Sequence, residues 1–289
     1  MSAPVRSVLM LSQTFYPDIG GAEKQALELS KSLAGRGVKV TVLTRQPGGL
    51  PAEEDLGGVR VKRLSVFGPR AVDSAVFMVK SFFWLLLHAG EYVAVHVHLA
   101  SSPAVAAVLA GRLTGRRTLV KLGGGRGVDE ITRSGHSLLG RLKLAFFRLA
   151  RPELLVMNDE VFDWLKNSKE FSGLRLRQFR NGVDTGRYTP PLYNEKINAK
   201  TAIGLDNAAL FLFVGRLSPE KRLKEFLEAW AEIFSDENPA PKIRLMIVGG
   251  GPEEAALKRA VTDLGVAGSV TLAGPKDDLL PYYRAADVF

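Results

Sequence analysis

Two positively charged residues stand just past an apolar run in the second half of the chain. Arg216 and Lys221 follow Leu210–Val214, which predicts a buried strand, and they stand at the start of a predicted helix, Lys221–Phe234. The backbone N–H groups at a helix start, together with the helix dipole, favour bound anions. An arginine fork suits two phosphate oxygens, and a lysine acts as a mobile point charge. The junction therefore predicts an anion site, with solvated surface charge as the alternative.

Paired glycines mark a similar junction near the N-terminus. Gly20 and Gly21 follow the first predicted strand, Ser7–Leu11, and precede the predicted helix Ala22–Arg36. Because glycine lacks a Cβ, its backbone approaches a ligand closely and adopts conformations closed to other residues. A ligand-binding loop and a merely flexible loop are both compatible with this pair.

Two further glycine runs follow predicted strands. Gly249–Gly251 comes after Ile243–Val248, without the G-x-G-x-x-G spacing and the acidic residue of a dinucleotide site. A nicotinamide-dependent dehydrogenase is therefore disfavoured. In the first half, Lys121 and Arg126 flank three glycines that either wrap an anion or form a mobile lid.

Predicted strands and helices alternate along the chain, as in right-handed βαβ units whose parallel sheets are covered on both faces. The pattern runs to Phe179 and restarts at Leu210. Between them, Asn181–Leu192 is rich in Gly, Pro and Thr, which is typical of a hinge. We therefore predict an α/β fold with two Rossmann-like parallel-sheet domains, 1–190 and 191–289, facing one another across a cleft.

Composition excludes several classes of protein. The 289 residues suffice for two domains, and the absence of cysteine excludes disulfides, cysteine-ligated zinc and cysteine nucleophiles. The N-terminus has no signal-peptide pattern, and the longest apolar run, Phe82–Leu87, is too short to span a bilayer. We expect a cytoplasmic protein.

The excess positive charge lies in the first half. Residues 1–150 contain 20 Lys and Arg against 10 Asp and Glu, whereas 151–289 contain 19 against 20, which together give the net charge of +9. Such a field attracts nucleic acid, an anionic membrane or a phosphorylated substrate. No basic stripe interleaved with aromatic residues is present, so we expect no nucleic-acid partner.

One predicted helix in this basic half, Leu138–Ala150, is amphipathic. Its apolar residues lie along one face, with arginine and lysine among or opposite them; that face consists of Leu138, Leu142, Ala145, Phe146 and Leu149. Burial of the stripe against the sheet is one interpretation. Peripheral contact with an anionic membrane carrying a lipid-linked acceptor, at the cytoplasmic face, is the other.

Several motifs together resemble the family-4 (group 1) glycosyltransferases. They follow that family's order and spacing, and they are Phe15–Thr44, Asn181–Tyr188, Arg216–Lys221, Ile247–Glu253, Val270–Gly274 and Tyr282–Phe289. The resemblance implies the GT-B fold, two Rossmann-like domains with the active site between them. It also implies transfer of a sugar from a nucleotide-sugar donor to a glycan or lipid-linked acceptor. In this family, transfer usually retains the anomeric configuration and needs neither a metal ion nor a cofactor.

The resemblance assigns roles to residues already singled out. Arg216 and Lys221 would bind the donor diphosphate and stabilise the departing nucleotide, where charge develops. Gly20 and Gly21 would lie beside the donor. The remaining donor-side candidates form the nucleobase loop and its neighbour: Gly249, Gly250, Gly274, Pro275 and Lys276.

On the acceptor side, fewer residues match those that the family resemblance implies. The family's histidine near the reacting sugar would stand at Leu122 or Gly123, so we assign no catalytic base. His98, one strand earlier, either contacts the acceptor or packs at the strand end, and Lys121 and Arg126 are further acceptor-side candidates.

The family's acidic E-x7-E motif normally follows the strand that begins at Asp287. We therefore expect a truncated chain with a partial donor domain, whose activity stays open. A glycosyltransferase is the leading hypothesis. The alternatives are a non-catalytic fragment and a GT-B sugar-nucleotide epimerase or hydrolase, although the latter needs histidines and carboxylates that the chain does not visibly place.

Overall fold

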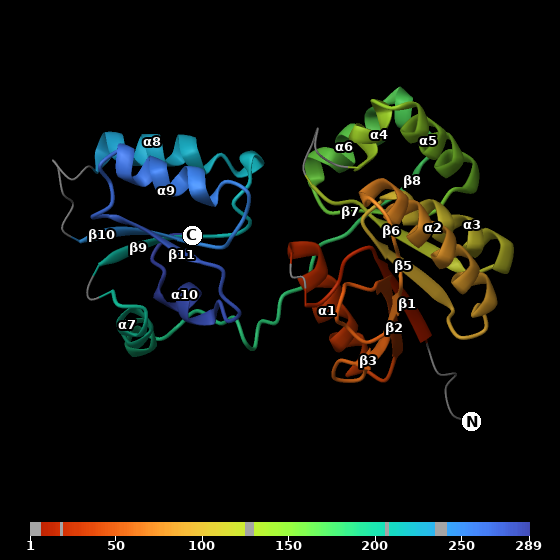
Figure 1. The fold of residues 1–289 in the computed structure, drawn as a ribbon, viewed down its shortest axis with the longest axis horizontal. Helices are drawn as coiled ribbons and strands as arrows, with labels where there is room; N and C mark the ends of the chain where they lie inside the picture. Colours follow the sequence, from red (N-terminus) through yellow and green to blue (C-terminus); the bar gives the residue numbers. More distant parts are fainter. Residues whose placement is uncertain (1–6, 18–19, 125–129, 206–207, 235–241) are drawn as a thin grey trace. The chain divides into compact units, whose positions relative to one another are not determined.

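The computed structural model describes residues 7–17, 20–124, 130–205, 208–234 and 242–289. The chain forms two compact units, Met1–Gly182 and Val183–Phe289 (Figure 1). The division falls at the start of the segment expected as a hinge, Asn181–Leu192, and not at its end near Pro190. Both units alternate strands and helices, so the predicted α/β class is confirmed.

The first unit is built on an eight-stranded sheet in the order β3-β4-β2-β1-β5-β6-β7-β8. Its neighbouring strands are parallel except for the β3–β4 pair. The strands are β1 (Ser7–Ser12), β2 (Lys39–Arg45), β3 (Glu53–Asp55), β4 (Val59–Leu64), β5 (Ala94–His98), β6 (Arg117–Lys121), β7 (Glu153–Val156) and β8 (Arg175–Gln178).

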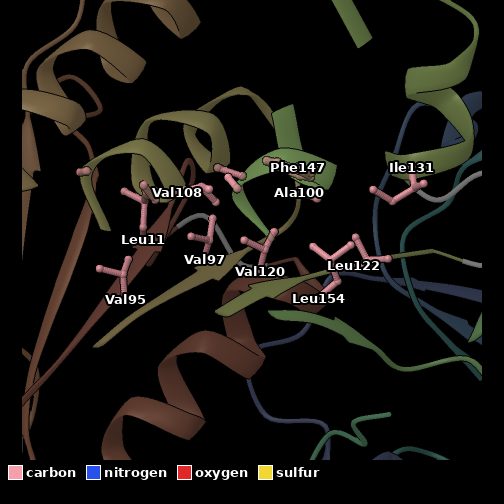
Figure 2. Packing of buried hydrophobic residues seen from close by; sticks show 14 of the residues in the cluster. Leu11, Val95, Val97, Ala100, Val108, Val120, Leu122, Ile131, Phe147 and Leu154 are labelled. Carbon is pink, nitrogen blue, oxygen red and sulfur yellow. The ribbon is translucent and has the colours of Figure 1, made fainter. Parts of the chain in front are cut away.

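Helices cover both faces of this sheet because successive strand side chains point to opposite faces. Leu9 and Leu11 pack on one side with residues of α2, α3, α5 and α6, and Met10 packs on the other with α1. Figure 2 shows Leu11, Val97 and Val120 of the strands meeting Phe147 of α5. The helices are α1 (Gly21–Ala34), α2 (Arg70–Leu87), α3 (Ser102–Thr114), α4 (Glu130–Gly135), α5 (Leu138–Ala150) and α6 (Asp159–Asn167).

The strand order reverses between β1 and β5. After β1 the chain passes through α1 to β2 on one side, and after β4 it returns through α2 to β5 on the other. In parallel α/β sheets, the carboxyl ends of the strands at such a reversal are the usual place for a ligand. Ser12 of β1 and His98 of β5 are paired at these ends.

The second unit has a smaller parallel sheet, in the order β11-β10-β9. Helices α8 and α9 pack on one face with Trp230 and Ile247, and α7 and α10 pack on the other with Leu212 and Ala285. The elements are α7 (Tyr193–Ala202), β9 (Ala209–Val214), α8 (Leu223–Ile233), β10 (Ile243–Val248), α9 (Glu254–Asp263), β11 (Val270–Gly274) and α10 (Leu280–Ala285). Beyond α10, Val288 forms a parallel bridge with Phe211 on the edge of β9.

One boundary near the candidate site differs from the prediction. The helix expected from Lys221 begins instead at Leu223, because Pro219–Lys221 form a separate 3-10 turn and Arg222 adopts a left-handed backbone conformation with φ of 53°. In the described ranges, no helix combines the length and the apolar character needed to cross a bilayer.

Candidate functional site

The two cations of the second unit flank Glu220 in the sequence, and both influence its carboxylate. Arg216 follows β9 and is exposed, and Lys221, also exposed, ends the 3-10 turn. The pKa of Glu220, between them, is lowered first by a hydrogen bond from Ser218 and also by the charges of Lys221 and Arg216. Both charges therefore act on Glu220, and both residues are exposed.

Glycines hold the Arg216 loop in place through backbone packing. The N–H of Gly215 donates to the carbonyl of Val248 at 3.0 Å, and the N–H of Leu217 donates to that of Gly250 at 3.0 Å. A Cβ on Gly249 would overlap the carbonyl oxygen of Gly215, and Gly249 also has a φ of +143°. The loops after β9 and β10 can lie against each other only because this position has no side chain.

The same backbone packing extends to β11. The N–H of Gly249 donates to the carbonyl of Gly274 at 2.9 Å, and Pro275 lies beside Gly250. Lys276 follows as an exposed residue. The carboxyl ends of β9, β10 and β11 thus form one surface that holds the donor-side candidates of this unit. An apolar hollow of about 640 Å³ adjoins Lys221 and is lined by Phe211, Phe213 and Phe226.

Gly20 and Gly21 begin α1 in the first unit, as expected. Gly20 is the N-cap residue, and a Cβ there would meet the carboxylate of Glu23 unless that side chain moved. The hydroxyl of Thr14 donates to Glu23 and holds it in this position. Gly21 has open space where a side chain would be. The N-terminus of the helix therefore already carries an internal negative charge.

Two arginines outside the predicted site contact the segment that follows β1. Arg45 Nε donates to the carbonyl of Gln13 at 2.9 Å, and an Nη atom of Arg63 donates to the carbonyl of Tyr16 at 3.1 Å. Arg63 also bonds the carbonyl of Pro51 at 3.2 Å and the carboxylate of Glu54. Its side chain is only 1% exposed.

A sequence signal for Arg63 was present. In β4 it shares a face with the buried residues Val59 and Val61, so the alternation places a charge where an apolar residue is expected. Such a charge needs partners. The partners lie 9 to 47 positions away in the sequence, so strand alternation alone does not identify them.

The acceptor-side candidates form a buried cluster at the carboxyl ends of β5 and β6. His98 pairs with Lys121 in the strand register, and the His98 ring stacks on that of His96 at 4.3 Å between centroids. Lys121 Nζ donates to Asn181 Oδ1 at 2.7 Å and lies 5.7 Å from the ring centre of Phe179. Arg126 lies outside the described residues.

Burial sets the protonation of this cluster. It lowers the pKa of His96 to about 4, with a smaller contribution from the charge of Lys121. Burial also lowers the pKa of His98 well below its ordinary value, assisted by His96 and Lys121, and it lowers the pKa of Lys121. Both histidines are therefore neutral near pH 7.

Helix α5 turns a different face to the core from the one its apolar stripe suggested. Its buried residues are Leu144, Phe147 and Ala150. On the stripe, Phe146 is partly buried and packs against the core, whereas Leu138, Leu142 and Leu149 are 59–80% exposed. The interpretation that the whole stripe is buried against the sheet is therefore wrong for its three leucines, because apolar residues occur on both faces of this helix.

Among the described residues, no group of three or more His, Cys, Asp or Glu side chains could hold a metal ion.

Comparisons with known proteins cover nearly the whole chain. The model of Glycosyltransferase Family 4 matches residues 19–187, and that of Glycosyl transferases group 1 matches 208–289. D-inositol 3-phosphate glycosyltransferase 2 of Catenulispora acidiphila is 31% identical over 96% of this chain and 70% of its own length. UDP-Gal:alpha-D-GlcNAc-diphosphoundecaprenol alpha-1,3-galactosyltransferase of Escherichia coli is 27% identical over 71% of this chain and 52% of its own length.

A solved structure shows the same fold. Alr3699/HepE of Anabaena, in complex with UDP and glucose, superposes with a TM-score of 0.70 at 18% identity, over 97% of this chain and 72% of the other. The predicted architecture of two parallel-sheet units of the GT-B type is confirmed by this likeness. The chain spans between about half and 70% of the two relatives' lengths.

Proposed function

Because the chain belongs to Glycosyltransferase Family 4, we propose that it transfers a sugar from a nucleotide-sugar donor to a glycan or lipid-linked acceptor. The observation that carries this proposal is the exposure of Arg216 and Lys221 beside the closely packed glycines at the carboxyl ends of the second sheet. Two related proteins support the substrate classes. The Anabaena structure contains UDP and glucose, and the Escherichia coli relative is named for UDP-Gal and a diphosphoundecaprenol-linked sugar.

The two cations act on the departing group. When the bond between the anomeric carbon and the diphosphate oxygen breaks, negative charge accumulates on the leaving diphosphate. Arg216 offers a fork to two of its oxygens, and Lys221 adds a mobile charge. Donors aimed at developing charge lower the barrier, so these side chains supply stabilisation that a metal ion supplies elsewhere. Transfer with retention of configuration, with no cofactor, is part of the proposal.

Backbone packing fixes where Arg216 stands. Its two neighbours, Gly215 and Leu217, are each hydrogen-bonded to the β10 end and the loop that follows it. An arginine held at both flanks needs little rearrangement when the diphosphate arrives, and such preorganisation is what makes electrostatic stabilisation effective. Gly249 is in this account a positioning residue, with Gly274 and Pro275 beside it.

We assign the acceptor to the first unit, at the carboxyl ends of β5 and β6. His98 and Lys121 lie there, next to the strand-order reversal between β1 and β5. The basic character of residues 1–150 favours an acceptor that carries negative charge.

Peripheral contact with an anionic membrane completes the proposal. Leu138, Leu139 and Leu149 project from α5 at 76–80% exposure. The sequences of α3 and α5 contain no acidic residue, and Arg112 and Arg141 are exposed on them. Exposed leucines among basic side chains suit a bilayer interface with anionic lipid, where a lipid-linked acceptor would lie.

The test is transfer itself. The protein is incubated with UDP-sugars and GDP-sugars, with and without lipid-linked and free glycan acceptors, and products are identified by mass spectrometry. Acceptor-dependent transfer, lost in Arg216→Ala and kept in Lys224→Ala, is expected; Lys224 is an exposed lysine of α8. Donor breakdown that needs no acceptor would identify a hydrolase, and donor binding without turnover would identify a non-catalytic protein.

A further inference from the structure

Four consecutive residues after β1, residues 13–16, are each held by a different part of the first unit. They belong to no helix or strand. Connecting loops of this kind usually make few fixed contacts and are the more mobile parts of a fold. The chain then runs on to Gly20 and Gly21, where α1 begins. The way in which this loop is fastened therefore bears on the position of these two glycines.

Arg45 joins the first residue of the loop to two other elements. It is the last residue of β2, the neighbour of β1. Its Nε donates to the carbonyl of Gln13 at 2.9 Å, and an Nη atom donates to the carboxylate of Asp73 at 2.8 Å. The side-chain amide of Gln13 in turn donates to the hydroxyl of Ser74 at 2.8 Å. Since Asp73 and Ser74 lie near the start of α2, one guanidinium group links the ends of two strands to the start of a helix.

The other three residues of the loop have anchors of their own. The hydroxyl of Thr14 donates to the carboxylate of Glu23, in the first turn of α1. The side chain of Phe15 is buried in the core on the α1 side of the sheet. The carbonyl of Tyr16 accepts a hydrogen bond from Arg63 of β4 at 3.1 Å. All four residues are thus fixed, and the bond between Thr14 and Glu23 connects the loop to α1.

Stability alone is a weak reason for the contacts of Arg45. Its side chain and that of Asp73 are 22% and 24% exposed, and partly exposed ion pairs contribute little to the free energy of unfolding. Side chains that lock the position of a neighbouring group are, by contrast, a common requirement of binding and catalytic sites. The loop also follows β1 at the strand-order reversal, the usual place for a ligand in such a sheet.

We propose that Arg45 is a positioning residue, which acts through the loop of residues 13–16 to fix Gly20 and Gly21 beside the donor. This role rests on the proposed function, since the donor is what the family resemblance expects at these glycines. Gly21 has open space where a side chain would be, which leaves room for a ligand. A displacement of about 1 Å in a group that orients a substrate can lower a rate about 100-fold. The loss of Arg45 should therefore be felt at the donor.

Steady-state kinetics with the donor and the acceptor varied in turn provide the first test. We expect Arg45→Met to raise the KM for the donor about tenfold or more and to leave the KM for the acceptor unchanged. A loss of folded protein lowers the apparent kcat but changes neither KM, so a purely structural role predicts no such difference. Arg45→Lys keeps the charge but not the fork that reaches two partners, and should give an intermediate KM. Equal KM values for the donor in the wild-type protein and Arg45→Met would overturn the inference and leave the proposed function intact.

The matched control weakens the same unit at the amino ends of its strands. Tyr92 precedes β5, is buried, and donates its hydroxyl to the carbonyl of Leu85 at 2.6 Å. Tyr92→Phe removes one buried hydrogen bond and should leave both KM values at those of the wild-type protein. A KM for the donor that rises equally in Tyr92→Phe and Arg45→Met would show that lost stability is the cause, and would contradict a role for the loop.

A double variant tests whether the effect passes through the loop. Thr14→Val keeps the branched shape of threonine but no longer donates to Glu23. If Arg45 and Thr14 act on the glycines through one loop, combining Arg45→Met with Thr14→Val should raise the KM for the donor no more than the larger single change. Independent sites have additive free energies, so their effects on KM would multiply. Multiplied effects would argue against a shared path through the loop and sink the inference.

A last measurement needs no substrate. Hydrogen exchange of the amides of residues 22–26, at the start of α1, should be faster in Arg45→Met than in the wild-type protein and in Tyr92→Phe. Equal protection in all three proteins would show that Arg45 does not hold this end of the loop, and would overturn the inference whatever the activity. A wild-type protein that transfers no sugar from any donor would instead refute the proposed function, and with it the role of Arg45 beside the donor.

Discussion

The two units place their functional cations in opposite ways. In the first unit, Arg63 and Lys121 are buried and depend on carbonyl, amide or carboxylate partners from distant segments. In the second, Arg216 and Lys221 are exposed, and it is the backbone around them that is tightly packed. Removing a buried cation changes the free energy of unfolding, whereas removing an exposed one changes it little and mainly affects ligand binding. We therefore expect Arg63 to act by positioning a loop, and Arg216 and Lys221 to act by binding.

The largest effect is expected at Arg63. Arg63→Met removes its bonds to the carbonyls of Tyr16 and Pro51 and leaves the Glu54 carboxylate without its partner. Breaking such a buried network costs about 3–5 kcal/mol of unfolding free energy. Arg216→Met, at an exposed cation of the second unit, should cost less than about 0.5 kcal/mol. Urea denaturation of both variants measures the difference, and equal losses would remove the contrast between the units.

The packing of the second unit is tested at Gly249. Gly249→Ala places a Cβ against the Gly215 carbonyl and in an unfavourable φ, so we expect a loss of about 3 kcal/mol together with weaker nucleotide binding. Gly250→Ala, one residue along, meets its nearest atoms at 3.7 Å and should cost less than about 1 kcal/mol. Thermal and urea unfolding compare the two, and a tolerated Gly249→Ala would show that this loop is not held by close packing.

The buried histidines predict a pH dependence of the first unit. The folded pKa of His96, about 4, lies below the value of 6.5 expected when unfolded, and that of His98 is lowered as well. Between these values the unfolded chain binds more protons, so stability is full above pH 6.5 and falls as pH decreases. The protonation of His96 in the unfolded chain alone should lower the free energy of unfolding by about 3 kcal/mol at pH 4, relative to neutral pH.

Among the described residues, the carboxylates with shifted pKa values all have pKa values below their ordinary 3.8–4.5, and therefore below the range of the histidines' titration in the unfolded chain. The interval from pH 4.5 to 6.5 therefore reports mainly on the histidines. The free energy of unfolding, measured by chemical denaturation at several pH values across this interval, should depend much less on pH in the His96→Gln, His98→Gln double variant than in the wild-type protein. An unchanged slope would show that these rings are not held neutral by burial.

The smallest expected effect concerns the membrane. Leu139→Glu combined with Leu149→Glu should reduce flotation with vesicles containing anionic lipid about tenfold or more, because two exposed apolar side chains no longer insert. Leu192→Glu, at a residue of the second unit that is equally exposed, should float like the wild-type protein. Flotation that is independent of anionic lipid, or equal losses in both variants, would contradict a contact through α5.

Local pattern was enough to predict most of the fold. The apolar run Ile243–Val248 predicted β10 with the observed bounds, and Leu210–Val214 predicted β9 to within one residue at its start. By contrast, β3 was missed because its sequence, Glu-Glu-Asp, has no strand-forming residue and is held by pairing with β4. Helix α7 was missed because its apolar residues lack a strong helical period.

In the candidate site, too, local sequence signals could be predicted and contacts between distant segments could not. Arg216 and Lys221 were identified because charge at a strand-to-helix junction is a local signal, but the role of Gly249 depends on the Gly215 carbonyl, which lies in another loop. Strand alternation places His96 and His98 on one face of β5, and the structure shows that their rings stack. It does not predict which ring nitrogens lack a hydrogen-bond partner among the described residues, since that depends on every neighbouring element. The exposed face of α5 was likewise fixed by its packing and not by its period.

The most direct test of the account is the affinity for a nucleoside diphosphate. UDP and GDP are titrated by calorimetry into the wild-type protein, the Arg216→Ala, Lys221→Ala double variant, and a control lacking two other exposed lysines of the second unit, Lys224→Ala with Lys258→Ala. We expect the first variant to bind the preferred nucleotide about 100-fold more weakly, for two lost charge-assisted hydrogen bonds, and the control to bind normally. Equal affinities in all three proteins would contradict the assignment of the donor diphosphate to Arg216 and Lys221.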